Sequence, residues 1–200
     1  MTNHEQLGFN DLLADAAETN AKHVFEKQTA HLPDTIEEAI AMHAKQIVMH
    51  HEVMLTGDLE TAYAIRHEAH LMARKINGGA FGIFADVYAP GRVLARASRA
   101  SDGEPPLWGQ SATFEIALES VLCRVEFQGI FGKGLITTPG LGFEVSAVDR
   151  SQPFISKTDY RSFLGYGMYP DLGMTPKGFA ERVIKHHVET QLKGALVQIG

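Results

Sequence analysis

The sequence has 200 residues, of which 44% are hydrophobic and 21% charged, a composition typical of a globular domain with a sizeable core and not of a disordered chain. Its net charge of −6 disfavours broad nucleic-acid binding, because such affinity comes from Lys and Arg replacing counterions along phosphates. No apolar run approaches the roughly 18 residues that cross a bilayer, and the single cysteine, Cys123, excludes an intrachain disulfide and a cysteine zinc cluster.

The pattern predicts a single α+β domain over residues 1–200, and its helical part, residues 10–77, comes first. Residues 10–29 carry apolar side chains at helical spacing behind an acidic first turn, which predicts an N-terminal helix. Residues 1–8 precede this pattern, and we expect them to form a flexible tail.

Two further helices are predicted to form an αα-hairpin over residues 35–77. Thr35 and Glu38 have the spacing of a capping box, which marks the start of the first of the two. Asp58 caps the second, which ends at an Asn-Gly-Gly run, a common helix C-terminus. Because the turn between them is very short, the two helices should lie antiparallel.

A β-rich part is expected over residues 80–170. The stretch 113–128 alternates in hydrophobicity and predicts two strands that meet near residues 119–120, with Glu115 opposite Arg124 on the solvent face. The shared apolar face consists of Phe114, Ile116, Leu118, Val121, Cys123, Val125 and Phe127. Residues 143–149 predict a third strand, and residues 91–98 are a weaker strand candidate.

The chain should close with a helix over residues 175–193, because Thr175 is a good N-cap and proline follows at the first helical position. An N-terminal helix and a hairpin, a central and mainly antiparallel sheet, and a C-terminal helix together define the α+β class.

Three of the ten histidines suggest a metal site: His43 in the first hairpin helix, and His67 and His70 in the second. His43 and His70 should lie at the same height, and zinc needs three or four converging ligands. The expected apolar stripes, however, place these two on opposite sides of the helix pair and put His51 in the core with one hydrogen bond. His67 and His70 also lack the i, i+4 spacing of H-E-x-x-H. We therefore predict no cofactor and keep zinc as the alternative.

A second pattern in the same helix is a polar edge formed by Tyr63, Arg66, His67, His70 and Arg74 at three- and four-residue spacing. Donors in such a row suit an anion, a phosphate-bearing ligand or an acidic protein surface. We predict Tyr63, Arg66, His70 and Arg74 as ligand-binding residues. The alternative is that this edge is only a solvated helix flank.

The loop 149–167 gathers polar side chains around aromatic residues and could present them at a sheet edge, where binding residues commonly lie. The candidate binding residues there are Arg150, Tyr160 and Arg161. As an alternative, Ser156 and Asp159 have N-cap spacing for a short helix ending at Gly165.

No nucleophile motif or phosphate-binding loop is present, and Cys123 falls on the expected core face. We therefore predict a non-catalytic cytoplasmic domain that binds a partner protein or a small polar or anionic ligand, without membrane association and compatible with a homo-oligomer. The alternative is a metal-dependent hydrolase using His43, His67 or His70 with a carboxylate from the sheet. A nucleic-acid accessory protein is the third interpretation, which the acidic charge disfavours.

Overall fold

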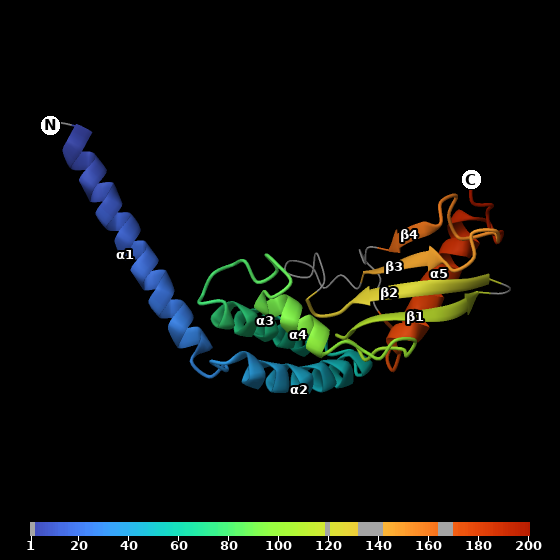
Figure 1. Ribbon diagram of the computed structural model, residues 1–200, viewed down its shortest axis with the longest axis horizontal. Helices are drawn as coiled ribbons and strands as arrows, with labels where there is room; N and C mark the ends of the chain where they lie inside the picture. The colour runs from blue at the N-terminus through green and yellow to red at the C-terminus, as the bar shows by residue number, and fades with distance from the viewer. Residues whose placement is uncertain (1–2, 119–120, 132–141, 164–169) are drawn as a thin grey trace.

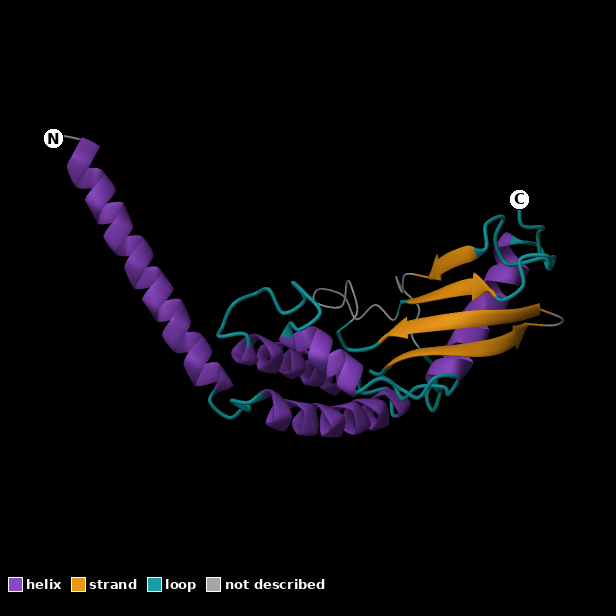
Figure 2. Cartoon of the chain, in the orientation of Figure 1, coloured by secondary structure: helices purple, strands orange, loops and turns teal. Residues whose placement is uncertain are grey.

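The computed structural model describes residues 3–118, 121–131, 142–163 and 170–200. Within these residues the chain folds as predicted into the α+β class, with helices before and after a four-stranded antiparallel sheet (Figures 1 and 2). The helices are α1 Asn3–Thr29, α2 Ile36–Leu55, α3 Leu59–Ile76, α4 Pro90–Ala97 and α5 Pro176–Gln191. The strands are β1 Ser111–Leu118, β2 Val121–Gln128, β3 Phe143–Ala147 and β4 Tyr160–Phe163.

The hairpin helices begin where their capping residues predicted. The hydroxyl of Thr35 accepts a hydrogen bond from the backbone N–H of Glu38, and the carboxylate of Asp58 accepts one from Thr61. Both bonds satisfy backbone donors that a helix N-terminus leaves free. The first helix differs from expectation, because α1 already begins at Asn3 and so includes residues for which we predicted a tail.

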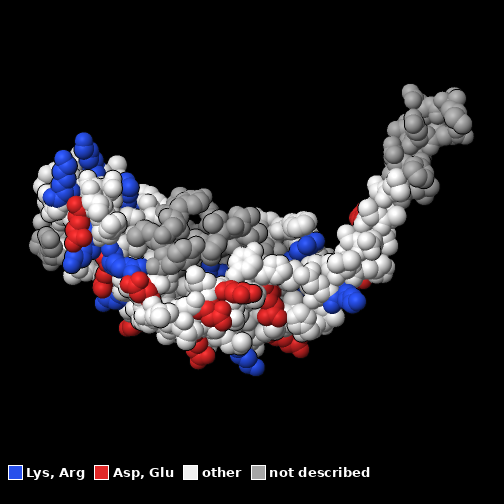
Figure 3. Space-filling model, turned by 180° about the vertical axis from the view of Figure 1, so that it is seen from behind, with Lys and Arg blue, Asp and Glu red and all other residues white. Residues whose placement is uncertain are grey.

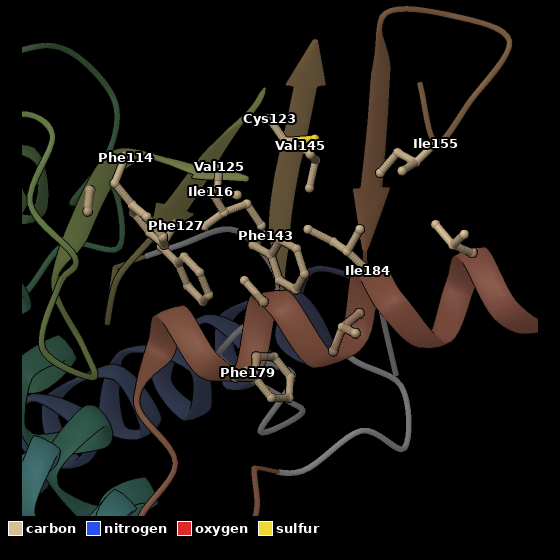
Figure 4. Packing of buried hydrophobic residues seen from close by; sticks show 14 of the residues in the cluster. Phe114, Ile116, Cys123, Val125, Phe127, Phe143, Val145, Ile155, Phe179 and Ile184 are labelled. Atoms are coloured by element: carbon tan, nitrogen blue, oxygen red, sulfur yellow. The ribbon is translucent and has the colours of Figure 1, made fainter. Parts of the chain in front are cut away.

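The sheet is a meander in the order β1-β2-β3-β4, and each strand pairs antiparallel with the next. The predicted register of β1 and β2 is confirmed: Glu115 lies opposite Arg124, and their side chains approach to 3.4 Å on the solvent face. The side chains of the other face point toward α5, where Phe143 packs against Phe127 and Phe179 (Figure 4). The closing helix therefore covers one face of the sheet, while the alternate residues of the strands face solvent.

The apolar core has two parts. The sheet part lies between the strands and α5, and the helical part lies between α2, α3 and α4. Trp108 precedes β1 and is buried at the boundary: its ring packs on Phe127 and Phe179, while its backbone contacts α2. The loop that carries the tryptophan therefore joins the hairpin to the sheet.

Two predicted elements are wrong. Residues 91–98 are not a strand, because they contain most of α4, in which the buried Gly91 and Leu94 have helical spacing and Pro90 occupies the first turn. The short helix suggested by Ser156 and Asp159 is also wrong at its start, because residues 160–163 form β4 and pair with β3. Its expected end, Gly165, lies outside the described residues.

Candidate functional site

The predicted polar edge of α3 is not one surface in the structure. Tyr63 is 44% exposed and His67 is also exposed, whereas Arg66 is only 5% exposed and faces α2. His70 is half-buried, and Arg74 lies near the other end of the helix, beside α1. The prediction that these side chains share one exposed edge is therefore wrong, and the edge divides into an internal cluster and a contact with α1.

The internal part is a chain of hydrogen bonds from α3 through α2 to the tryptophan loop. Arg66 donates from Nε to Nε2 of His50 at 2.8 Å, and Nδ1 of His50 lies 3.0 Å from the carbonyl oxygen of Trp108. Next to it, Nδ1 of His51 accepts a hydrogen bond from the backbone N–H of Trp108 at 3.1 Å. Adjacent histidines of α2 therefore fix the tryptophan loop.

Burial keeps His50 neutral. Removal from water, together with the charge of Arg66, lowers the pKa of His50 from 6.5 to about 3. The neutral ring then donates from Nδ1 to Trp108 and accepts at Nε2 from Arg66, which determines its tautomer. Burial also lowers the pKa of Arg66 from 12.5 to about 10, so the guanidinium remains charged at neutral pH.

A second group of interior polar side chains lies on α2 and α3, and two of its members pack against Phe131. The imidazole rings of His43 and His70 lie 5.0 Å and 5.1 Å from its ring centre, so the expected height match of these two histidines holds. Within the described residues, both ring nitrogens of His43, Oε1 of Gln46 and Nε2 of His70 are buried without a hydrogen-bond partner. Desolvation is the main reason why the pKa of His43 falls from 6.5 to about 4; Gln46 opposes this shift, and the nearby His70 adds to it.

The expected stripe of α2 is wrong in phase. Its buried side chains are Ala39, His43, Gln46, Ile47, His50 and Met54, so the stripe is turned by roughly 80° from the one we expected around Ile40, Ala44 and Ile47. As a result His43 and His50 lie in the interior, and His51 is half-buried with one hydrogen bond. Sequence reasoning missed His50 and Gln46, although they continue the i, i+3, i+4 spacing from Ala39.

This burial does not assemble a zinc ligand set in the part of the chain that the structure describes. No group of three or more His, Cys, Asp or Glu side chains there is placed to hold a metal ion. His67, the third ligand of the metal alternative, lies on the exposed side of α3. His43 and His70 are the two candidate ligands that the fold brings together.

Arg74 closes the base of a cleft between α1 and α3. Its guanidinium lies 4.3 Å from the ring centre of Phe25 and 4.0 Å from that of Phe81, and its Nε donates to the carbonyl of Gly79 at 2.6 Å. The cleft has a volume of about 790 Å³, and α1 lines it with Glu18, Lys22 and Glu26 among other residues. Through these contacts Arg74 anchors α1.

The second predicted binding region lies at the far side of the sheet. Arg150 forms an ion pair with Asp159, Tyr160 is exposed, and Arg161 lies 5.9 Å from the ring centre of Phe163. These residues lie beside β4, away from α3, so the structure does not join the two predicted regions into one site (Figure 1).

Cys123 has the packing role that we predicted. It is fully buried in the middle of β2, and burial raises the pKa of its thiol from 9.0 to about 11. A nucleophilic cysteine needs the opposite shift and access to solvent.

The feature most open to a partner is α1. It projects away from the rest of the molecule and makes contact only near its C-terminal end (Figure 1). Between residues 13 and 28 only Phe25 is half-buried, and the apolar side chains of Leu13 and Val24 are 53% and 58% exposed. Beside its base, Phe81 is 82% exposed. We refer to α1 as the arm.

The charges are unevenly spread over the surface. On the face seen in Figure 3, Lys and Arg gather at the end that carries the sheet, while acidic side chains follow the lower side, over the helices. None of the helices in the described ranges is both long and apolar enough to cross a membrane.

Comparison with known proteins gives a partial relationship. Two curated relatives, each named Protein KlcB and each from Escherichia coli, are 34% identical to this chain. One matches over 134 residues, which are 66% of this chain and 32% of the relative. The other matches over 158 residues, which are 78% of this chain and 32% of the relative. The chain thus spans about a third of the length of the curated relatives it matches. No family description and no solved structure matches the chain.

Proposed function

We propose that this chain is a non-catalytic protein-binding domain whose interface is the arm, and that its partner there is a second copy of the chain. The observation that carries this proposal is that a long helix extends from the fold with most of its apolar side chains exposed, Phe25 at its base being the half-buried one. An isolated helix gains little stability in water, since most helical stability in proteins comes from packing an apolar face. A partner helix would supply that packing.

Most of the apolar side chains in the described part of the arm lie on one side of the helix. At 100° per residue, six apolar side chains of the arm fall within an arc of about 120°. They are Leu13, Ala14, Ala17, Ala21, Val24 and Phe25. The charged side chains of residues 13–28 all lie outside this arc. Because three of the six are alanines, a second helix could approach closely along the middle of this face.

The order of these residues favours a second copy over an unrelated helix. The six positions are spaced symmetrically along the helix on either side of Thr19. In an antiparallel pair of arms, each apolar residue of one arm would therefore lie at the height of an apolar residue of the other. The positions that would lie at the same height are Leu13 and Phe25, Ala14 and Val24, and Ala17 and Ala21, with the two alanines nearest the centre of the face. A two-fold axis produces such a self-complementary interface from one surface.

The rest of the fold supports binding without catalysis. The described titratable groups with strongly lowered or raised pKa values are all buried side chains: His43, His50, Arg66 and Cys123. The single buried thiol fits a cytoplasmic location. In longer relatives such as KlcB, the matching region would act as one part of a larger chain.

Sedimentation equilibrium of the full chain tests this proposal with two variants at neighbouring positions. Ala17→Glu puts a carboxylate at the centre of the paired face, where it would be buried beside Ala21 of the other copy. Ala16→Glu makes the same change about 100° around the helix, outside the apolar arc. We expect the wild type and Ala16→Glu to dimerise equally, and Ala17→Glu to dimerise at least about ten-fold more weakly, equivalent to about 1.4 kcal/mol.

Two results would contradict the proposal. One is a wild-type chain that stays monomeric at the highest concentration reached. The other is a dimer that Ala17→Glu weakens no more than Ala16→Glu does, because association would then use another surface.

A further inference from the structure

Arg66 holds a positive charge inside the protein without a negative partner in the described part of the chain. Its side chain is 5% exposed, and its two hydrogen bonds go to His50, which is neutral, and to the sulfur of Met54 at 4.0 Å. None of the ion pairs among the described residues includes Arg66. A buried charge that is not compensated costs several kcal/mol, so a counter-charge would stabilise the fold.

Among the described residues that line the space beside Arg66, none offers a carboxylate for this purpose. Arg66 lines a cavity together with residues that carry no acidic side chain, namely Leu107, Trp108, Gly109, Gln110, Phe127, Gly129, Ile130, Gly142 and Pro176. The sequence of residues 132–141, which connects Phe131 to Gly142, contains neither Asp nor Glu. The amide of Gln110 is already used, because its oxygen accepts from Leu107 and its nitrogen donates to Ser98.

Two glycines shape this cavity. Gly109 has φ +99°, and a Cβ there would lie 2.9 Å from Nδ1 of His50. Gly129 has φ +70°, and a Cβ there would lie 2.6 Å from the carbonyl oxygen of Gly109. Both positions therefore require glycine, and the two loops pack backbone against backbone beside Arg66.

We propose that the cavity beside Arg66 is a binding site for a compact monovalent anion of the size of chloride. The guanidinium N–H groups donate to the anion, which neutralises the buried charge. The cavity measures about 30 Å³, and since one water needs roughly 10–15 Å³, it has room for one such ion or about two waters. This small volume favours a compact anion over a phosphate or a carboxylate-bearing metabolite. The cavity is separate from the arm, so the proposal of an anion site does not depend on whether the chain dimerises.

Thermal unfolding of the full chain in two sodium salts tests this site. Chloride fits the cavity and gluconate does not, so the comparison at constant ionic strength and pH isolates specific binding from screening. With chloride at ten times its dissociation constant, we expect the wild-type Tm to be about 3–6 °C higher in chloride than in gluconate. Arg66→Met, which keeps most of the side-chain volume, should remove this difference. Arg96→Met, at an exposed position of α4, should retain it.

The result that overturns the proposal is a wild-type Tm that is equal in the two salts, or a chloride effect that Arg66→Met leaves intact. Since Arg66→Met could fail to fold, wild-type crystals grown in sodium bromide provide a second measurement. An anomalous bromide peak within hydrogen-bonding distance of the Arg66 guanidinium supports the site, and a cavity without such a peak at saturating bromide overturns it.

Discussion

Replacing His43 with leucine should make the protein less sensitive to acid. In the folded state burial lowers the pKa of His43 from 6.5 to about 4, so the unfolded state binds a proton more readily than the folded state. This contribution to stability is complete above pH 6.5 and is lost as the pH falls toward 4. Between pH 7 and pH 5 the wild type should therefore lose about 1.8 kcal/mol through this group. His43→Leu should lose that much less over the same interval.

Urea unfolding at pH 7 and pH 5 measures both losses directly. His67→Leu is the matched control, because it removes an exposed histidine from the same hairpin, and its loss should equal that of the wild type. If His43→Leu and the wild type lose the same free energy of unfolding between the two pH values, then His43 is not buried in neutral form and the described packing against Phe131 is wrong.

Two other predictions concern packing. Leu94→Ala should lower the free energy of unfolding by about 2–5 kcal/mol, because Leu94 of α4 is fully buried in the helical part of the core. A loss below about 1 kcal/mol in urea denaturation would mean that α4 does not pack on the hairpin. Gly103→Ala should cost about 1–2 kcal/mol through its positive φ alone, since no atom lies within 4 Å of the added Cβ. Gly129→Ala has a comparable φ and also a backbone clash at 2.6 Å, so we expect at least twice that loss by calorimetry, and equal losses would contradict the close packing of the two loops.

Local signals in the sequence were sufficient for much of the fold. Thr35 and Asp58 are N-caps because a side-chain oxygen three residues ahead of a free N–H satisfies that donor, whatever surrounds the helix. The register of β1 and β2 followed in the same way from strict alternation, which places Glu115 opposite Arg124 once Phe114 faces inward.

The candidate site was less predictable because its polar residues occupy core positions. We assigned the stripe of α2 from its aliphatic side chains, but three of its six buried residues are His43, Gln46 and His50. No hydropathy pattern marks these as interior, because their partners come from other parts of the chain: Arg66 and Trp108 bond to His50, and Phe131 packs against His43. The single exposed edge predicted on α3 was wrong for a similar reason, since Arg66 is buried and has its partner on α2.

The position of Trp108 also determines what an optical experiment on this protein can detect. It is the only tryptophan in the chain, and its indole N–H donates to Met174 just before α5, while its backbone is held by His50 and His51 of the hairpin. Its emission therefore responds to separation of the helical and sheet parts as well as to loss of either one. If the two parts melt at different temperatures, fluorescence should follow the first of these transitions, while far-ultraviolet circular dichroism should record both.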